Sequence, residues 1–267
     1  MNQRIRFGAV GAALMAVTLA SASPAAAVNL FSVQQDVEVG RQAAAQADRQ
    51  LRILRDPTAT RYVDAIVQRV ADEAKGPRFN YQVKIVDSKE INAFALPGGF
   101  VYVNRGLISA VRNEDELAGV LAHEIAHVVE RHGTENATKA YGAQAGAGIL
   151  AQVLLGRNRR MGLPQQIIGS LGLNAAFMKF SRDAENEADR VGAEMMSRAG
   201  YDPMAMADFF DLLQAQKRSN PNAVSQFFSS HPSPANRAAN LRRYASQLGG
   251  GTGTRVGNLR SVQARLG

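Results

Sequence analysis

The chain has 267 residues, a formal net charge of +8 and no cysteine. The absence of cysteine excludes disulfide bonds, thiolate catalysis and lipid anchoring through an N-terminal cysteine. The positive charge is concentrated near the C-terminus, where Leu212 to Gly267 contains basic residues but no Asp or Glu. No nucleic-acid-binding motif accompanies this charge, so we interpret it as a solvated basic surface and expect no nucleic-acid partner.

The N-terminal segment has the pattern of a secretory signal peptide. Arg4 and Arg6 give a positive start, Phe7 to Ala20 is apolar, and Ala25 to Ala27 supplies small residues for cleavage. A retained membrane anchor is the alternative, although the apolar run is short for a bilayer span. We therefore predict residues 1–27 to be a signal peptide and the protein to be exported to the periplasm.

Two helix patterns are followed by strand patterns between residues 31 and 104. Apolar residues at helical spacing predict amphipathic helices over residues 31–54 and 58–74. The period then changes, and alternating apolar residues predict a strand over residues 81–86. Residues 91–104 are interpreted as two short strands joined at Pro97-Gly98-Gly99.

The hairpin within residues 91–104 is predicted to lie at a sheet edge, because proline and glycine are confined to such positions. An exposed edge can bind an extended peptide as an additional strand. The candidate substrate-binding residues are therefore Asn92, Ala93, Phe94 and Ala95. A plain structural hairpin explains the spacing equally well, and this alternative stays open.

A helix predicted over residues 113–132 carries the motif His-Glu-x-x-His. His123 and His127 are four residues apart, so they lie on one helical face and both imidazoles can reach one ion. Glu124 is placed to take a proton from a metal-bound water. Neutral imidazoles suit Zn²⁺, which keeps a position open for water. If the pattern is not accidental, it predicts one zinc ion per chain and a third ligand elsewhere.

The third ligand is predicted on a second polar helix that opens at Ser181. Glu185 and Asp189 are four residues apart and share a face. One carboxylate can bind the metal, and the other can hydrogen-bond to a ligand histidine. A solvated acidic face is the alternative, and Glu187 is assigned to it. Because zinc needs a third ligand, we favour Glu185 for the metal and Asp189 for the histidine.

The remaining segments complete a single predicted domain over residues 28–248. Residues 141–180 are apolar but interrupted by polar side chains and glycines, so buried or lid-forming helices are expected there. Contact of that region with a membrane surface stays open. Further helices are predicted over 201–217 and 234–248, and residues 249–267 are predicted to form a flexible basic tail.

Four segments together resemble one enzyme family. In chain order they are Asn92-Ala-Phe-Ala-Leu-Pro-Gly-Gly99, Glu116-Leu-Ala-Gly-Val-Leu-Ala-His-Glu-Ile-Ala-His127, Ser181-Arg-x-x-Glu185-x-x-Ala-Asp189 and His231-Pro. Their content and order resemble the HtpX-like and CAAX-prenyl-endopeptidase family of zinc metallopeptidases (gluzincins). Within that family, the soluble exported BepA-type members are the most similar.

The resemblance implies a gluzincin fold. We accordingly predict a mostly helical α+β, zincin-like domain with a small antiparallel sheet over the active-site helix. It implies zinc on His123, His127 and Glu185, with Glu124 as the general base. It also implies that His231 lies near the metal, either as a donor to the developing oxyanion or as a plug in the open zinc position. From its place in the sequence alone, a loop-packing histidine would be favoured.

The expected function is zinc-dependent endopeptidase cleavage of unfolded or misfolded proteins in the cell envelope, as part of protein quality control. The competing class is a non-catalytic or weakly catalytic envelope chaperone that holds clients on the edge strand. A structural zinc site usually has four protein ligands, and retention of Glu124 argues against that class. A cell-wall peptide hydrolase is a second enzymatic alternative. The expected partners are unfolded polypeptides, with outer-membrane assembly proteins and a peripheral membrane contact left open.

Overall fold

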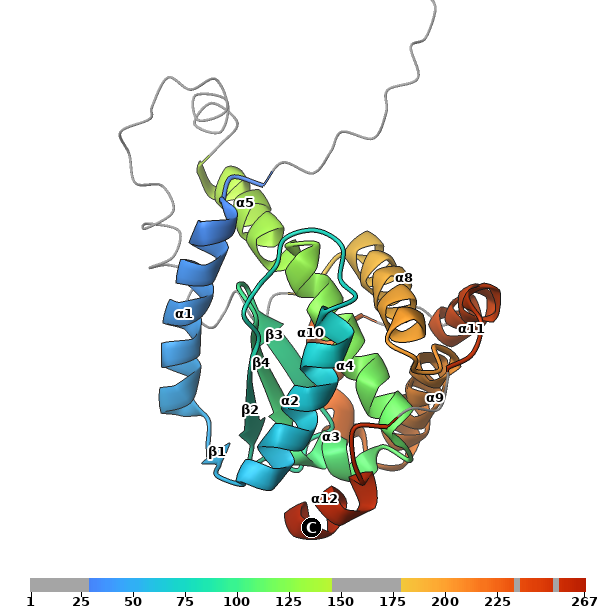
Figure 1. Cartoon of the computed structure of the whole chain (residues 1–267). Coiled ribbons are helices and arrows are strands. Elements are labelled where there is room, and N and C mark those ends of the chain that lie inside the picture. The colour runs from blue at the N-terminus through green and yellow to red at the C-terminus, as the bar shows by residue number, and fades with distance from the viewer. Residues whose placement is uncertain (1–28, 146–178, 233–235, 252–254) are drawn as a thin grey trace, which may run out of the picture.

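The computed structural model describes residues 29–145, 179–232, 236–251 and 255–267. These parts of the chain are mostly helical with one small sheet (Figure 1), as the sequence predicted. The elements before the first internal gap are α1 Val33–Gln50, β1 Ile53–Leu54, α2 Pro57–Ala71, β2 Gln82–Val86, β3 Ala93–Leu96, β4 Phe100–Asn104, α3 Arg105–Ala110, α4 Glu114–Val129 and α5 His132–Ala145. Those after it are α8 Arg182–Arg198, α9 Met204–Ser219, the 3-10 helix η1 Pro221–Val224, α10 Ser225–Ser230, α11 Arg237–Leu248 and α12 Leu259–Leu266.

The sheet has four strands in the order β1-β2-β4-β3. The predicted hairpin is confirmed, because β3 and β4 pair antiparallel and Pro97, Gly98 and Gly99 join them. The sheet, predicted to be antiparallel, is mixed, because its central strands β2 and β4 are parallel. After β2 the chain forms β3 at the far edge and returns through the hairpin. β4 therefore lies between β2 and β3 and runs parallel to β2. β3 is left at an edge of the sheet.

The two faces of the sheet are covered by different helices (Figure 1). α1 packs on one face through Ala43, Ala44 and Ala47, against a group that includes Phe94 and Tyr102. At the hairpin the backbones approach closely, since a Cβ on Gly98 would lie 2.6 Å from the Cα of Val37. Gly98 also has a φ of +80°, a conformation that glycine adopts without strain. Helix α1 therefore fixes the hairpin from outside.

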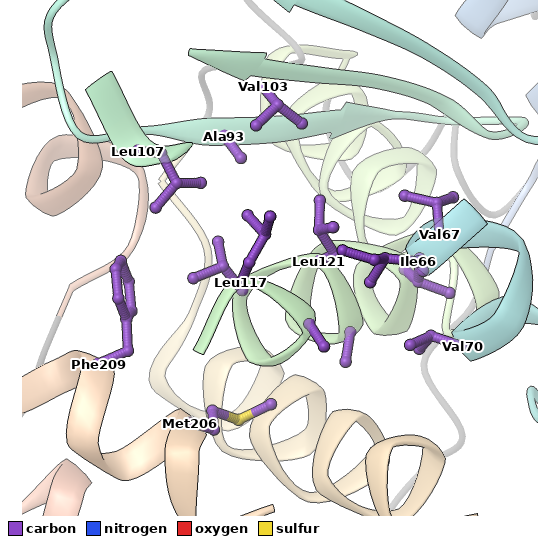
Figure 2. Packing of buried hydrophobic residues seen from close by; sticks show 14 of the residues in the cluster. Ile66, Val67, Val70, Ala93, Val103, Leu107, Leu117, Leu121, Met206 and Phe209 are labelled. Atoms are coloured by element: carbon purple, nitrogen blue, oxygen red, sulfur yellow. The ribbon is translucent and has the colours of Figure 1, made fainter. Parts of the chain in front are cut away.

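The opposite face of the sheet packs on α4, which lies at the centre of the main hydrophobic core (Figure 2). Side chains from the sheet, α2, α3 and α9 surround this helix. The figure labels Leu117 and Leu121 from α4 itself and, from the surrounding elements, Ile66, Val67, Val70, Ala93, Val103, Leu107, Met206 and Phe209. Every residue of α4 is buried. Its histidines are therefore held on a helix that is enclosed on all sides.

The backbones of helices α8 and α4 lie close together. A Cβ on Gly192 would lie 3.2 Å from the carbonyl oxygen of Ala122, which is closer than an ordinary van der Waals contact. Ser181 caps α8 by accepting a hydrogen bond from the amide of Ala184. This close packing turns the carboxylates of α8 towards the histidines of α4.

Helix α4 ends earlier than the sequence predicted. It stops at Val129, and His132 begins α5 instead of completing the same helix. Between them Arg131 has a φ of +61°, which a right-handed helix cannot contain. The Arg131 guanidinium is bound by buried Asp36 of α1, with Nε 2.5 Å from Oδ2. This tertiary contact holds the turn, and its effect on the helix end is not visible in a local pattern.

The prediction of a flexible tail over residues 249–267 is wrong for its final part. Residues 259–266 form α12, and Leu259, Val262 and Leu266 are buried in the main core. Gln263 also donates hydrogen bonds to the carbonyls at the end of α3.

The helices predicted within residues 141–180 lie largely outside the described residues. No helix in the described ranges has the length and apolar character needed to cross a bilayer.

Candidate metal centre

Two histidine side chains of α4 meet at their outer ring nitrogens. His123 and His127 are both buried, and their Nε2 atoms are 3.0 Å apart. The spacing of one helical turn places both rings on the same face, as the motif predicts. Each Nε2 can offer its lone pair to a shared cation.

Glu185 and His231 bring two more donor groups to the same point. Glu185 places Oε1 3.4 Å from Nε2 of His127 and Oε2 3.6 Å from Nε2 of His123. His231, immediately after α10, places Nδ1 3.0 Å from Oε1 of Glu185. One donor atom from each of these four buried residues lies within 4.8 Å of the others.

The first three of these residues fit a zinc ion. Ligand atoms about 2.0–2.1 Å from a tetrahedral zinc are about 3.3 Å from one another. The two Nε2 atoms are 3.0 Å apart, and those of His127 and His123 lie 3.4 and 3.6 Å from Oε1 and Oε2 of Glu185, respectively, which are distances close to that value. Two imidazoles and one carboxylate are also donors typical of a catalytic zinc site, which keeps a further position open.

The charge states of the donors suit a cation. Burial lowers the pKa of His127 well below its ordinary value, so this ring is neutral and can act as a ligand. Burial alone would raise the pKa of Glu185, but the surrounding histidines, His231 first among them, lower it below its ordinary value. Glu185 is therefore a carboxylate anion at neutral pH.

Asp189 lies behind the metal-facing side of His123. Its Oδ1 is 3.0 Å from Nδ1 of His123, on the opposite side of the ring from Nε2. This is the contact expected of a carboxylate that orients a ligand histidine. Burial opposes ionisation of Asp189, but the charge of Arg237 and the hydrogen bonds with His123 and Arg237 together lower the pKa of this carboxyl below its ordinary value.

Arg237 is a site residue that sequence reasoning missed. It is 2% exposed. Its Nε and Nη2 donate to the two oxygens of Asp189, both at 2.7 Å, while Nη1 donates to Oε2 of Glu185 at 2.6 Å. The guanidinium also lies over the ring of Phe210, 4.1 Å from its centroid. Arg237 thus fixes the carboxylates of Glu185 and Asp189. It follows the His-Pro segment by only a few residues, which is the one signal the sequence offers.

Glu124 points into the site from the other side. One carboxylate oxygen, Oε2, accepts a hydrogen bond of 3.2 Å from the amide of Ala95 in β3. The other, Oε1, is buried and has no hydrogen-bond partner among the described residues. Burial is the main cause of a raised pKa for this carboxyl. A buried carboxylate with one free oxygen beside a set of metal ligands can hold a water and accept its proton.

His231 closes the site opposite α4. It is 1% exposed, and its Nε2 lies 3.5 Å from Oε1 of Glu124. Nδ1 of the same ring is 3.3 Å from Nε2 of His123. The ring therefore occupies the space between the base and the metal ligands. Both roles considered from the sequence, oxyanion donor and plug, require this position.

The four predicted substrate-binding residues differ in how they face the site. Asn92, Ala93 and Phe94 are buried, and the ring of Phe94 stacks on Tyr102 in the cluster under α1, away from the histidines. Ala95 is half-buried, and only its backbone contacts Glu124. A pocket beside this position is lined in part by Ala95, Pro97, His127 and Phe180.

Together, a mostly helical fold, a mixed sheet over the central helix and a His-Glu-x-x-His motif facing a glutamate define the class of zinc metalloendopeptidases. The sequence profile of peptidase family M48 matches residues 57–245. The chain belongs to this family.

Several known proteins are similar to the chain. The "Beta-barrel assembly-enhancing protease" of Escherichia coli (strain K12) is 28% identical in a match that covers 93% of this chain and 54% of that protein. The protein of the same name from Yersinia pestis is 31% identical and covers 82% and 45%. The "Mitochondrial metalloendopeptidase OMA1" of Schizosaccharomyces pombe is 30% identical and covers 69% and 52%. The chain thus spans about half the length of the relatives it matches.

Proposed function

We propose that residues 28–248 form a zinc-dependent endopeptidase domain that hydrolyses internal bonds of unfolded polypeptides. The observation that supports this most strongly is the convergence of His123, His127 and Glu185 beside the free oxygen of Glu124. Zinc, when bound by the first three residues, supplies a Lewis acid and lowers the pKa of water. A purely structural ion would need no buried carboxylate with a free oxygen next to it.

The residues of the chain then have distinct tasks. Glu124 takes a proton from the attacking water on Oε1 and returns it to the leaving amine, so one carboxylate acts first as base and then as acid. Asp189 keeps His123 in the tautomer whose Nε2 is free to bind, and Arg237 fixes the orientation of Asp189 and Glu185.

The substrate strand is proposed to add to the free edge of β3. β3 is the last strand of the described sheet, and the amide of Ala95 faces Glu124 rather than β4. A polypeptide laid along this edge would cross directly in front of the base. Pairing through the main chain depends little on side chains, so recognition should require an extended, unfolded segment.

This substrate proposal predicts that folded proteins are spared. Reduced, unfolded substrate should be cleaved, and the same protein locked by its disulfides should be cleaved far more slowly. Gel analysis of a disulfide-rich protein in its two redox forms tests this, with a reductant-insensitive substrate such as casein as the control for enzyme activity. Equal rates for the locked and reduced forms would rule out recognition of an extended strand.

The cellular setting is proposed from the N-terminal pattern and the relatives. We place the protein in the periplasm after removal of residues 1–27, and we propose protein quality control with outer-membrane assembly proteins among its partners. The names of two relatives, which refer to β-barrel assembly, support this. In cells producing the Glu124→Gln variant, we expect outer-membrane proteins to be held by the variant in the envelope fraction. Mass spectrometry that finds only cytoplasmic proteins would contradict it.

A further inference from the structure

The remaining histidine of the chain, His132, lies directly behind the second proposed zinc ligand, His127. His132, the first residue of α5, is 3% exposed. Its Nδ1 is 2.9 Å from Nδ1 of His127. Its Nε2 is 3.3 Å from Oε2 of Glu187 on α8. Three side chains from three helices thus form a line from the metal-facing ring to a carboxylate whose side chain is 46% exposed.

The proton positions along this line follow from the geometry. Nε2 of His127 faces His123 and Glu185, so as a ligand it carries no proton. A neutral His127 must then carry its proton on Nδ1 and donate it to Nδ1 of His132. Because that nitrogen accepts, His132 carries its own proton on Nε2 and donates it to Glu187. Only one direction of donation is consistent with His127 binding a metal.

We propose that His132 and Glu187 are positioning residues that hold His127 in its metal-binding tautomer and orientation. His123 has a direct carboxylate partner in Asp189. His127 has a carboxylate partner too, but reaches it through an intervening histidine. The carboxylate partners of the two histidines differ in exposure. Asp189 is 5% exposed, whereas Glu187 faces solvent and lies 3.9 Å from Arg190. This inference rests on the proposed zinc site.

A packing role for His132 is the competing explanation, and zinc affinity separates the two. We expect His132→Phe, which fills the space but cannot accept a hydrogen bond, to weaken zinc binding about 10- to 100-fold. His132→Asn should recover part of this loss, because its side-chain oxygen can take the place of the accepting Nδ1. Glu187→Ala should weaken binding by about three- to tenfold, as a more distant partner. Chelator competition with zinc alone measures all three.

Two controls make the test specific. Asp183→Asn removes an exposed acid from the same helix and should leave zinc affinity unchanged. The double variant with His132→Phe and Glu187→Ala should bind zinc no more weakly than His132→Phe, because Glu187 acts through His132. In the zinc-bound wild type, NMR should show a slowly exchanging Nδ1 proton on His127 that is lost in His132→Phe and kept in His132→Asn.

The inference is overturned by unchanged zinc affinity in His132→Phe and Glu187→Ala, by equal losses in the Phe and Asn variants, or by additive effects in the double variant. Glu187 is half-exposed, so its variant remains informative even if His132→Phe fails to fold. A wild-type protein that binds no zinc would remove this inference and the proposed function together. Normal zinc binding by the wild type with unchanged variants would remove only the inference.

Discussion

Replacing Glu124 with Gln is expected to lower peptide-bond cleavage by about two to four orders of magnitude while one zinc ion per chain is retained. The substitution keeps the size of the side chain but removes its capacity to accept a proton. Glu124 is not among the donors that converge on the metal position, so zinc affinity should not depend on it. The measurement pairs casein cleavage with zinc content on the same preparation.

Two further variants serve as controls for the Glu124→Gln result. Glu130→Gln changes an acid at the C-cap of the same helix, outside the donor group, and should keep wild-type cleavage. His123→Ala removes a proposed ligand and should lose both zinc and activity. Near-normal turnover of Glu124→Gln would take Glu124 out of the mechanism, whereas its loss of zinc would make it a ligand instead of a base.

His231→Ala is expected to raise activity. His231 fills the space between Glu124 and the metal ligands, with Nδ1 in the donor group and Nε2 3.5 Å from the free oxygen of the base. A ring in this position competes with water for the open metal site. If it blocks nine-tenths of the molecules, its removal should increase cleavage about tenfold. Initial rates on several unfolded substrates at saturating zinc measure this.

The alternative role makes the opposite prediction for the same variant. If His231 donates a hydrogen bond to the developing oxyanion, its loss should lower turnover by about 10²- to 10³-fold with zinc retained. Ser229→Ala, two residues away and exposed, serves as the control for disturbance of the loop. Wild-type rates in His231→Ala would exclude both roles and leave a packing histidine.

The helix with the His-Glu-x-x-His motif and the shared helical face of Glu185 and Asp189 could be anticipated because both rest on local spacing. Four-residue separations fix which side chains share a helical face, whatever the rest of the fold does. The need for a third ligand then selects Glu185 on a distant helix, and the structure places it among the histidines. The β3–β4 hairpin was predictable for a similar reason, since Gly98 marks its turn.

The features that were not anticipated depend on tertiary contacts. Arg237 is read as one more basic residue until its two buried carboxylate partners are known. The end of α4 is set by the contact of Arg131 with Asp36 on α1, some ninety residues earlier in the sequence. The polar, glycine-rich approach to α12 indicates a tail, but Leu259 and its neighbours find a place in the core. Local patterns carry no information on such partners.

The proposed zinc chemistry is tested most directly by titrating zinc back into the chelated protein while cleavage of unfolded casein is followed. We predict that the chelated protein is inactive and that activity returns in proportion to added zinc up to one ion per chain. The same titration of a His127→Ala variant should restore nothing. Full cleavage by the zinc-free protein, or restoration that is equally complete in His127→Ala, would contradict a catalytic zinc on His123, His127 and Glu185.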